Sequence, residues 1–88
     1  MPEPPITLTE VAAVFAAVDG GEGVPLTEEV LDLSFYDLGH DSLTVLQALA
    51  VLGDRYGVHV GKELVVDAET PRLLLDILQR LADWSRSA

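Results

Sequence analysis

The sequence predicts a small all-α domain: a bundle of three main helices plus one short helix, with a long loop after the first helix. Apolar residues repeat at helical spacing in three separate stretches, and no stretch of useful length alternates as a strand does. The chain has 88 residues, which is enough for one limited core. We therefore expect residues 1–88 to form a single domain, with flexible ends at 1–6 and 85–88.

The first helix is predicted over residues 8–19. Thr7 and Glu10 match a capping box ahead of an apolar run, and Gly20-Gly21 would end the helix. The buried stripe of this helix should consist of Leu8, Val11, Val14, Phe15 and Val18.

Residues 19–38 form a long connection that contains three glycines and one proline. Loops of this length are uncommon in compact domains and are often functional. Apolar residues recur along it, so we expect it to pack across the domain. These residues are Val24, Leu26, Val30, Leu31, Leu33, Phe35 and Leu38.

The second helix is predicted to begin at Asp41 or Ser42 and to end near Tyr56-Gly57. Steps of four, three and four residues place one set of apolar side chains on a single side, which is the expected core face. This set is Val45, Leu49, Leu52 and Tyr56. A short helical turn is expected around residues 62–66.

The last helix has a clear start, with Thr70 as the N-cap and Pro71 at the first helical position. Its apolar positions follow helical spacing and should form a buried stripe. They are Leu73, Leu74, Ile77, Leu78, Leu81 and Trp84.

The charge pattern limits the kinds of partner. The net charge is −10, and residues 1–54 contain no Lys or Arg. Such a field repels nucleic-acid phosphates and anionic membranes, whereas it attracts proteins with basic patches. The alternative is that the acidity only keeps an apolar-rich protein soluble.

Several classes of function are excluded by residue type. The chain has no cysteine, which excludes disulfides, thiolate catalysis and cysteine-based metal sites. No apolar run approaches a membrane span, and the N-terminus lacks the basic start of a signal peptide. We expect a soluble, cytoplasmic monomer that binds neither nucleic acid nor membrane.

Residues 35–43 read Phe-Tyr-Asp-Leu-Gly-His-Asp-Ser-Leu and contain the most specific motif. Gly39 provides the backbone freedom for a tight turn into a helix that begins with an Asp-Ser pair. The Ser42 hydroxyl would then lie beside free N–H groups and the positive end of the helix dipole, which favour a phosphate. The alternative is that Asp41 or Ser42 is an ordinary N-cap.

The segment 38–43, Leu-Gly-His-Asp-Ser-Leu, resembles the Leu-Gly-x-Asp-Ser-Leu motif of acyl carrier proteins. The similarity covers about residues 7–82 and is greatest to the discrete carriers of type II polyketide synthases. It includes Phe35-x-x-Leu38, Tyr56-Gly57-Val58 and Thr70-Pro71-Arg72-x-Leu74-Leu75-Asp76.

The resemblance implies that a phosphopantetheinyl transferase esterifies Ser42 with 4′-phosphopantetheine from coenzyme A. The thiol of this arm would hold a growing polyketide as a thioester, so the protein would be a carrier in antibiotic biosynthesis and not an enzyme. Gly39, Asp41 and Leu43 would flank the attachment point, with Asp41 helping the transferase to recognise the carrier or approaching its magnesium. Further partners would be the ketosynthase with its chain-length factor, an acyltransferase and a ketoreductase.

Neither of the two histidines is expected to be catalytic or to bind a metal. His40 stands where related carriers often have Tyr, and we expect a surface loop residue or a partner contact. A catalytic His-Asp-Ser set is not expected, because neighbouring residues in a tight turn point in different directions. His59 should be half-buried, and no metal site is predicted from two distant histidines.

The second helix departs from the family, in which this helix often carries acids that pair with basic partners. It has none between Ser42 and Gly53, so we expect a mostly apolar docking surface. This surface would comprise Leu43, Leu46, Gln47, Ala50 and Val51, flanked by Asp37, Asp41 and Asp54. The alternative is that Leu46 and Val51 contact the long connection.

Other functions remain as alternatives. A fatty-acid carrier fits less well because the acid-rich second helix is missing, and a peptidyl carrier tends to have Gly where Asp41 stands. An unmodified helical adaptor could bind partners through its second helix. A hydrolase based on Ser42 lacks a placed base.

Overall fold

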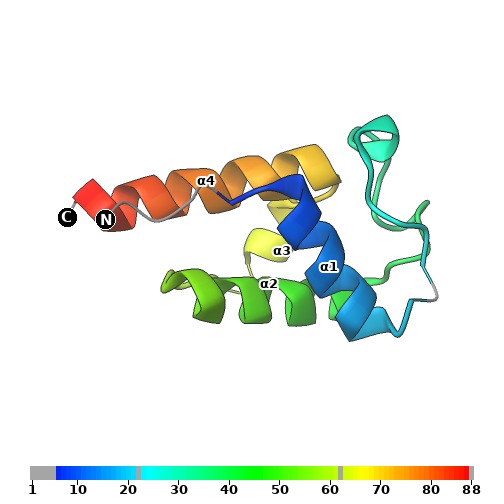
Figure 1. Cartoon of the computed structure of the whole chain (residues 1–88), viewed down its shortest axis with the longest axis horizontal. Helices are drawn as coiled ribbons and strands as arrows, with labels where there is room; N and C mark the ends of the chain where they lie inside the picture. Colours follow the sequence, from blue (N-terminus) through cyan, green and yellow to red (C-terminus); the bar gives the residue numbers. More distant parts are fainter. Residues whose placement is uncertain (1–5, 22, 62, 88) are drawn as a thin grey trace.

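The computed structural model describes residues 6–21, 23–61 and 63–87, with side chains as far as residue 84, and all regular elements within them are helical. The order is α1 (Leu8–Asp19), a 3₁₀ turn η1 (Glu28–Val30), α2 (Ser42–Tyr56), α3 (Leu64–Asp67) and α4 (Pro71–Ser87). In Figure 1, α2 and α4 form opposite sides, α1 runs from one to the other, and α3 lies between them. The predicted fold of three main helices and one short helix is confirmed.

The start of α1 confirms half of the predicted capping box. The Thr7 hydroxyl accepts a hydrogen bond from the Glu10 N–H at 3.4 Å, as an N-cap does. The Glu10 carboxylate, however, accepts a hydrogen bond from the Tyr56 hydroxyl at the end of α2. Glu10 therefore joins two helices, and α1 packs more extensively against α2 than against α4.

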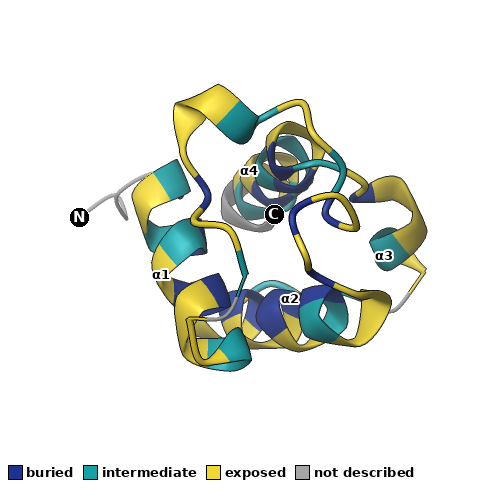
Figure 2. Ribbon diagram, turned by 90° about the vertical axis from the view of Figure 1, so that its right-hand side faces the viewer, coloured by how far each residue is buried: buried dark blue, intermediate teal, exposed yellow. Residues whose placement is uncertain are grey.

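The core lies between α1, α2 and α4, whose buried residues face inward in Figure 2. At its centre the rings of Phe15 and Phe35 stack with centroids 4.9 Å apart. Ile6, the last residue of the predicted flexible lead-in, is also buried; residues 1–5 of that lead-in lie outside the described part. The other buried apolar residues are Val11, Val14, Leu26, Leu38, Val45, Ala48, Leu49, Leu52, Ala68, Leu74 and Leu78.

The long connection packs across the domain, as expected, through Leu26, Phe35 and Leu38. Backbone hydrogen bonds fix it to the start of α4: the Phe35 N–H donates to the Glu69 carbonyl at 2.8 Å, and the Arg72 N–H to the Leu31 carbonyl at 3.0 Å. The middle of the long connection is therefore held against the residues at the start of α4. Two other residues of the predicted apolar set are substantially exposed, Val24 and Leu33.

The prediction for α4 is correct at its start and wrong at two apolar positions. The Leu73 N–H donates to the Thr70 hydroxyl at 3.2 Å, which confirms the cap. The core-facing side centres on Leu74 and Leu78, so Leu73, about 100° away on the helix, is 43% exposed. Trp84 is 77% exposed because α4 extends past the end of α2 (Figure 1).

The burial of one residue after α2 differs from expectation. His59 is exposed, not half-buried, because the short stretch after α2 lies on the surface. Helix α4 runs from Pro71 to Ser87, so it includes most of the predicted flexible end, whose flexibility stays a prediction. No helix within the described residues is long and apolar enough to cross a membrane.

Candidate functional site

The site is built around the N-terminus of α2. Asp41 has extended backbone angles and is the N-cap: its carboxylate accepts a hydrogen bond from the Thr44 N–H at 2.8 Å. That bond, together with one from the Thr44 hydroxyl, lowers the pKa of Asp41 below its ordinary value. Ser42 is consequently the first residue of the helix, which resolves the open choice of cap in favour of Asp41.

The turn into this helix requires a glycine. Gly39 has a φ of +84°, in the region that other residues adopt only with strain. The Gly39 N–H donates to the Tyr36 carbonyl at 3.1 Å, and the His40 N–H donates to the Phe35 carbonyl at 2.8 Å. These bonds close a tight turn that leads directly to Asp41.

The Ser42 side chain is exposed and makes no hydrogen bond to any other described residue. Its backbone N–H is one of the unpaired donors at the start of α2, where the helix dipole favours a negative group. The hydroxyl thus combines accessibility with an electrostatic setting that suits a phosphate ester.

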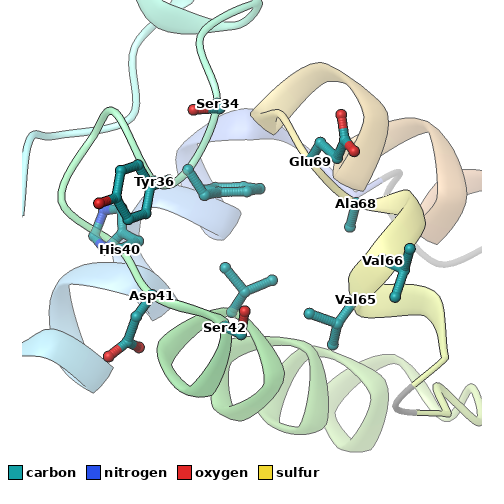
Figure 3. A pocket seen from close by; sticks show the side chains of 11 residues that line it. Ser34, Tyr36, His40, Asp41, Ser42, Val65, Val66, Ala68 and Glu69 are labelled. Carbon is teal, nitrogen blue, oxygen red and sulfur yellow. The ribbon is translucent and has the colours of Figure 1, made fainter.

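An open pocket of about 650 Å³ lies beside Ser42. It lies between the turn before α2, the first part of α2, and α3 with the residues that follow it. In Figure 3 the Ser42 hydroxyl points into this space, Val65 faces it from α3, and the Asp41 carboxylate points away. The lining residues are Ser34, Phe35, Tyr36, His40, Asp41, Ser42, Val45, Val65, Val66, Ala68 and Glu69.

The pocket combines an apolar interior with a polar rim. Phe35, Val45 and Ala68 are buried and form its inner surface. Tyr36 is 85% exposed and Glu69 is exposed, so these two can meet solvent or a partner at the mouth. Such a pocket suits an apolar chain whose polar end remains near the surface.

The structure overturns the expected place of His40. It is 3% exposed, and its ring lies edge-on to Phe15 and Phe35, with centroids 5.1 and 6.2 Å away. Its Nδ1 lies 3.2 Å from Oδ2 of Asp19, at the end of α1. The sequence could not show this, because the burial depends on a contact between His40 and the end of α1. Asp19, the residue contacted there, lies 21 positions earlier in the chain.

The arrangement does not form a hydrolytic triad. Asp19 and His40 lie together and Ser42 is nearby, but neither ring nitrogen of His40 makes a well-formed hydrogen bond to Ser42 or to any other described side chain. A nucleophilic serine needs a base in hydrogen-bond reach. No group of three or more potential metal ligands occurs in the described part of the chain.

The outer face of α2, defined here as Leu43, Leu46, Gln47, Ala50, Val51 and Asp54, is directed outward as expected. Leu43 is 61% exposed and Val51 41%, so Val51 is not covered by the long connection. Leu46 is half-buried at the margin, and Asp37 is exposed in the turn before the helix. This face is continuous along the chain with Ser42.

Sequence reasoning missed the far wall of the pocket. Val65, Val66, Ala68 and Glu69 come from α3 and the residues after it, and Tyr36 comes from the turn. A four-residue helix is too short to show an apolar period, so its sequence gave no sign of facing Ser42. The exposure of Val66, at 73%, is the type of feature that only the structure reveals.

Comparison with known proteins gives one family match and several close relatives. The family model described as "Phosphopantetheine attachment site" matches residues 9–78. The chain is 40% identical over 57 residues to the actinorhodin polyketide synthase acyl carrier protein of Streptomyces coelicolor, covering 65% of this chain and 66% of that protein. It is 31% identical over 74 residues to the granaticin polyketide synthase acyl carrier protein of Streptomyces violaceoruber, covering 83% and 87%.

Solved structures show the same likeness over nearly the whole chain. The holo form of the actinorhodin acyl carrier protein from S. coelicolor superposes with a TM-score of 0.83 at 29% identity, covering 96% of this chain and 99% of that one. The same carrier bearing a 3-oxo-butyl group gives the same TM-score, identity and coverage.

Proposed function

Because this chain belongs to the phosphopantetheine-attachment family, as an acyl carrier protein of the type II polyketide synthase kind, we propose that Ser42 carries its 4′-phosphopantetheine arm. The protein is a carrier and not a catalyst, and the arm is bound covalently. When attached, the arm supplies a terminal thiol that holds the acyl intermediate as a thioester. The chain itself has no cysteine that could do so.

The position of Ser42 is the observation that carries this proposal. Its hydroxyl is exposed at the start of α2, has no hydrogen-bond partner among the described residues, and points into the pocket (Figure 3). A phosphate ester at this position gains from the positive end of the helix dipole. The residues present therefore fit the group.

The chemistry of attachment leaves one task to the transferase. Attachment forms a bond from the Ser42 oxygen to phosphorus, breaks the diphosphate bond of coenzyme A and releases adenosine 3′,5′-bisphosphate. It also requires removal of the hydroxyl proton, and His40, the nearest histidine in sequence, makes no hydrogen bond to Ser42. The proton is therefore taken by a base of the transferase. On this proposal Gly39 and Asp41 shape the turn, and the Asp41 carboxylate, which points away from the pocket, is available to the transferase and its magnesium.

The pocket is proposed to shelter the part of the acyl chain that lies nearest to Ser42. Its inner surface is apolar and its volume is about 650 Å³, which is within the usual range for small-molecule sites. A chain that leaves this pocket reaches the partner enzyme as the arm swings outward. Tethering raises the effective concentration of the intermediate at each partner.

The protein works with synthase enzymes, and we propose the outer face of α2 as the surface they contact. The face begins one residue after Ser42 and contains two exposed aliphatic side chains, Leu43 and Val51. Asp54 at its far end and Asp37 and Asp41 beside its start give it negative charge. The transferase, the ketosynthase with its chain-length factor, the acyltransferase and the ketoreductase are the proposed partners of a cytoplasmic monomer.

The test is intact-mass measurement after incubation with coenzyme A and a permissive phosphopantetheinyl transferase. The wild-type chain should gain one phosphopantetheine, and Ser42→Ala should gain none, because alanine has no hydroxyl at the attachment position. Circular dichroism of the Ser42→Ala protein should match that of the wild type, since an exposed side chain has been changed.

Ser34→Ala is the matched control, because Ser34 is another hydroxyl that lines the pocket. This protein should still gain the group. A gain by Ser42→Ala, or its loss in Ser34→Ala with the fold intact, would place the arm elsewhere.

A further inference from the structure

His40 is a buried polar residue that the attachment of the arm does not by itself explain. It is 97% hidden from solvent and lies edge-on to Phe15 and Phe35. An apolar side chain would fill this volume at lower cost, because a buried nitrogen must forgo water. Buried polar atoms without good partners are rare in native proteins and call for an explanation.

The partner of the His40 ring is Asp19, the last residue of α1. Oδ2 of Asp19 lies 3.2 Å from Nδ1 of His40, which is ion-pair distance, although the two atoms do not make a well-formed hydrogen bond. The same carboxylate accepts hydrogen bonds from the Gly21 N–H at 2.7 Å and the Gly23 N–H at 3.1 Å. Asp19 therefore connects the end of α1, the start of the long connection and the residue two positions before Ser42.

The other edge of the ring is held by backbone. A Cβ atom at Gly23 would lie 2.3 Å from Cε1 and 2.8 Å from Nε2 of His40, so the ring fits tightly against this glycine. The Val24 N–H donates to the Leu38 carbonyl at 3.1 Å, and this bond joins the start of the long connection to its end beside the ring. The imidazole is clamped between α1, the start of the connection and the turn before α2.

His40 also separates two cavities. It lines the pocket beside Ser42 and a smaller cavity of about 100 Å³ that lies against α1, among Ala12, Phe15 and Asp19. Movement of the ring would change the wall of the pocket and the path of the backbone into Asp41 at the same time. Asp41 and Glu69 are the other acidic residues that line the pocket with His40.

From this arrangement we propose that His40 is a positioning residue for the modification of Ser42. The Nδ1 edge of its ring contacts the Asp19 carboxylate at 3.2 Å, and this contact fixes the turn at residues 38–41 so that the Ser42 hydroxyl is presented in one orientation. Nε2 lies against Gly23 with no acceptor among the described residues, so the proposal places the ring proton on Nδ1, the nitrogen that faces Asp19. This inference rests on the proposed role of Ser42.

Two substitutions at His40 separate pairing from packing. His40→Asn keeps a side-chain N–H close to the place of Nδ1 and loses volume, whereas His40→Phe keeps a ring and loses the donor. The rate of phosphopantetheine loading should fall about tenfold or more in His40→Phe, because small displacements of a reacting group are costly. His40→Asn should load faster than His40→Phe.

His59 provides the matched control, since it is an exposed histidine outside the site. His59→Asn and His59→Phe should load at the wild-type rate. If His40→Phe loads as fast as the wild type, or faster than His40→Asn, the ring only fills space and the proposal is wrong.

A second measurement does not depend on whether the His40 variants fold. Nitrogen-15 NMR of the wild-type imidazole should show the His40 proton on Nδ1, and this signal should shift in Asp19→Asn. A proton on Nε2 would contradict the proposal. Failure of the proposed function is distinguishable, because the wild type would then gain no mass or Ser42→Ala would still gain it.

Discussion

At the scale of single residues, the site depends on what Asp41 and Gly39 do for the backbone. Asp41 ends the turn and starts α2, so that the next side chain, Ser42, leaves the helix at its positive end. Gly39 adopts a φ of +84°, which allows the turn to be tight enough for this. The backbone of this motif therefore explains two of its residue types: the turn needs a glycine at position 39, and the helix needs a capping side chain at position 41.

The charge of Asp41 gives a pH-dependent prediction. The pKa of Asp41 is lowered in the folded protein by the bond from the Thr44 N–H, so the cap stabilises the fold above the ordinary value of 3.8 and this contribution is lost as the pH falls below it. At pH 7 the thermal midpoint of Asp41→Ala should lie below that of the wild type, and the gap should narrow in acid.

Asp41→Asn, which keeps an acceptor oxygen without the charge, should fall between the two proteins at pH 7. Thermal unfolding followed by circular dichroism at several pH values measures all three. Equal midpoints of the wild type and Asp41→Ala at pH 7 would contradict the capping role.

Gly23 gives a second prediction at this scale. Its added Cβ would meet the His40 ring and lie 2.7 Å from Oδ2 of Asp19, so Gly23→Ala must displace the pair. We expect the free energy of unfolding to fall by about 1–3 kcal/mol, the usual cost of overpacking. Urea denaturation checks this.

Gly61→Ala is the control, because its Cβ would meet only the far end of the exposed Glu63 side chain, which can rotate away. It should change stability by at most about 0.5 kcal/mol, as surface changes usually do. If both alanine variants are equally stable, the clamp on His40 is looser than the structure indicates.

At the scale of elements, α2 has two faces with different tasks. Val45, Leu49 and Leu52 face the core, while Leu43 and Val51 are exposed on the outer face of α2. The long connection and α3 complete the pocket at one end of the helix, and the Phe35 N–H bond to the Glu69 carbonyl holds them in place. The same helix thus provides core, attachment point and proposed docking surface.

Leu43→Glu tests the docking surface. A buried charge at the centre of a contact is unfavourable, so loading by the transferase or transfer to the ketosynthase should slow about fivefold or more. Helical circular dichroism should stay unchanged, because Leu43 is 61% exposed.

Leu73→Glu is the matched control for Leu43→Glu, since Leu73 is a leucine on α4 whose side chain is 43% exposed. This variant should support wild-type transfer rates. Equal rates for both variants would show that partners do not contact the outer face near Leu43.

At the scale of the whole molecule, stability rests on one small core that joins α1, α2 and α4. Leu49 and Leu52 are fully buried, and stacking of Phe15 on Phe35 ties the long connection to α1. Charge pairs at the surface, such as that of Arg72 with Asp32, are largely exposed and add little. A domain of this size has few contacts to spare.

Leu49→Ala should therefore be severe. Truncation of a buried leucine costs about 2–5 kcal/mol, against a typical total of about 5–15 kcal/mol for a folded protein. Leu43→Ala, on the exposed side of the same helix, should cost at most about 0.5 kcal/mol. Chemical denaturation monitored by circular dichroism compares them, and similar losses would mean that the faces of α2 are misassigned.

The sequence by itself determined the helices, the caps at Thr7 and Thr70, and the two faces of α2, and it narrowed the cap of α2 to Asp41 or Ser42. These features depend on residues within a turn or two of one another, so local spacing and capping chemistry specify them. The motif at residues 38–43 likewise indicated the family before any contact was known.

Only the tertiary structure decided the burial of His40, the exposure of Leu73 and Trp84, and the pocket beside Ser42. Each depends on segments far apart in the chain: Asp19 meets His40, and Phe35 is bonded to Glu69. A helical period shows which side of a helix is apolar. It does not show where the helices packed against that side end, or which of its residues they cover. That is fixed only when the helices pack and the long connection closes against them.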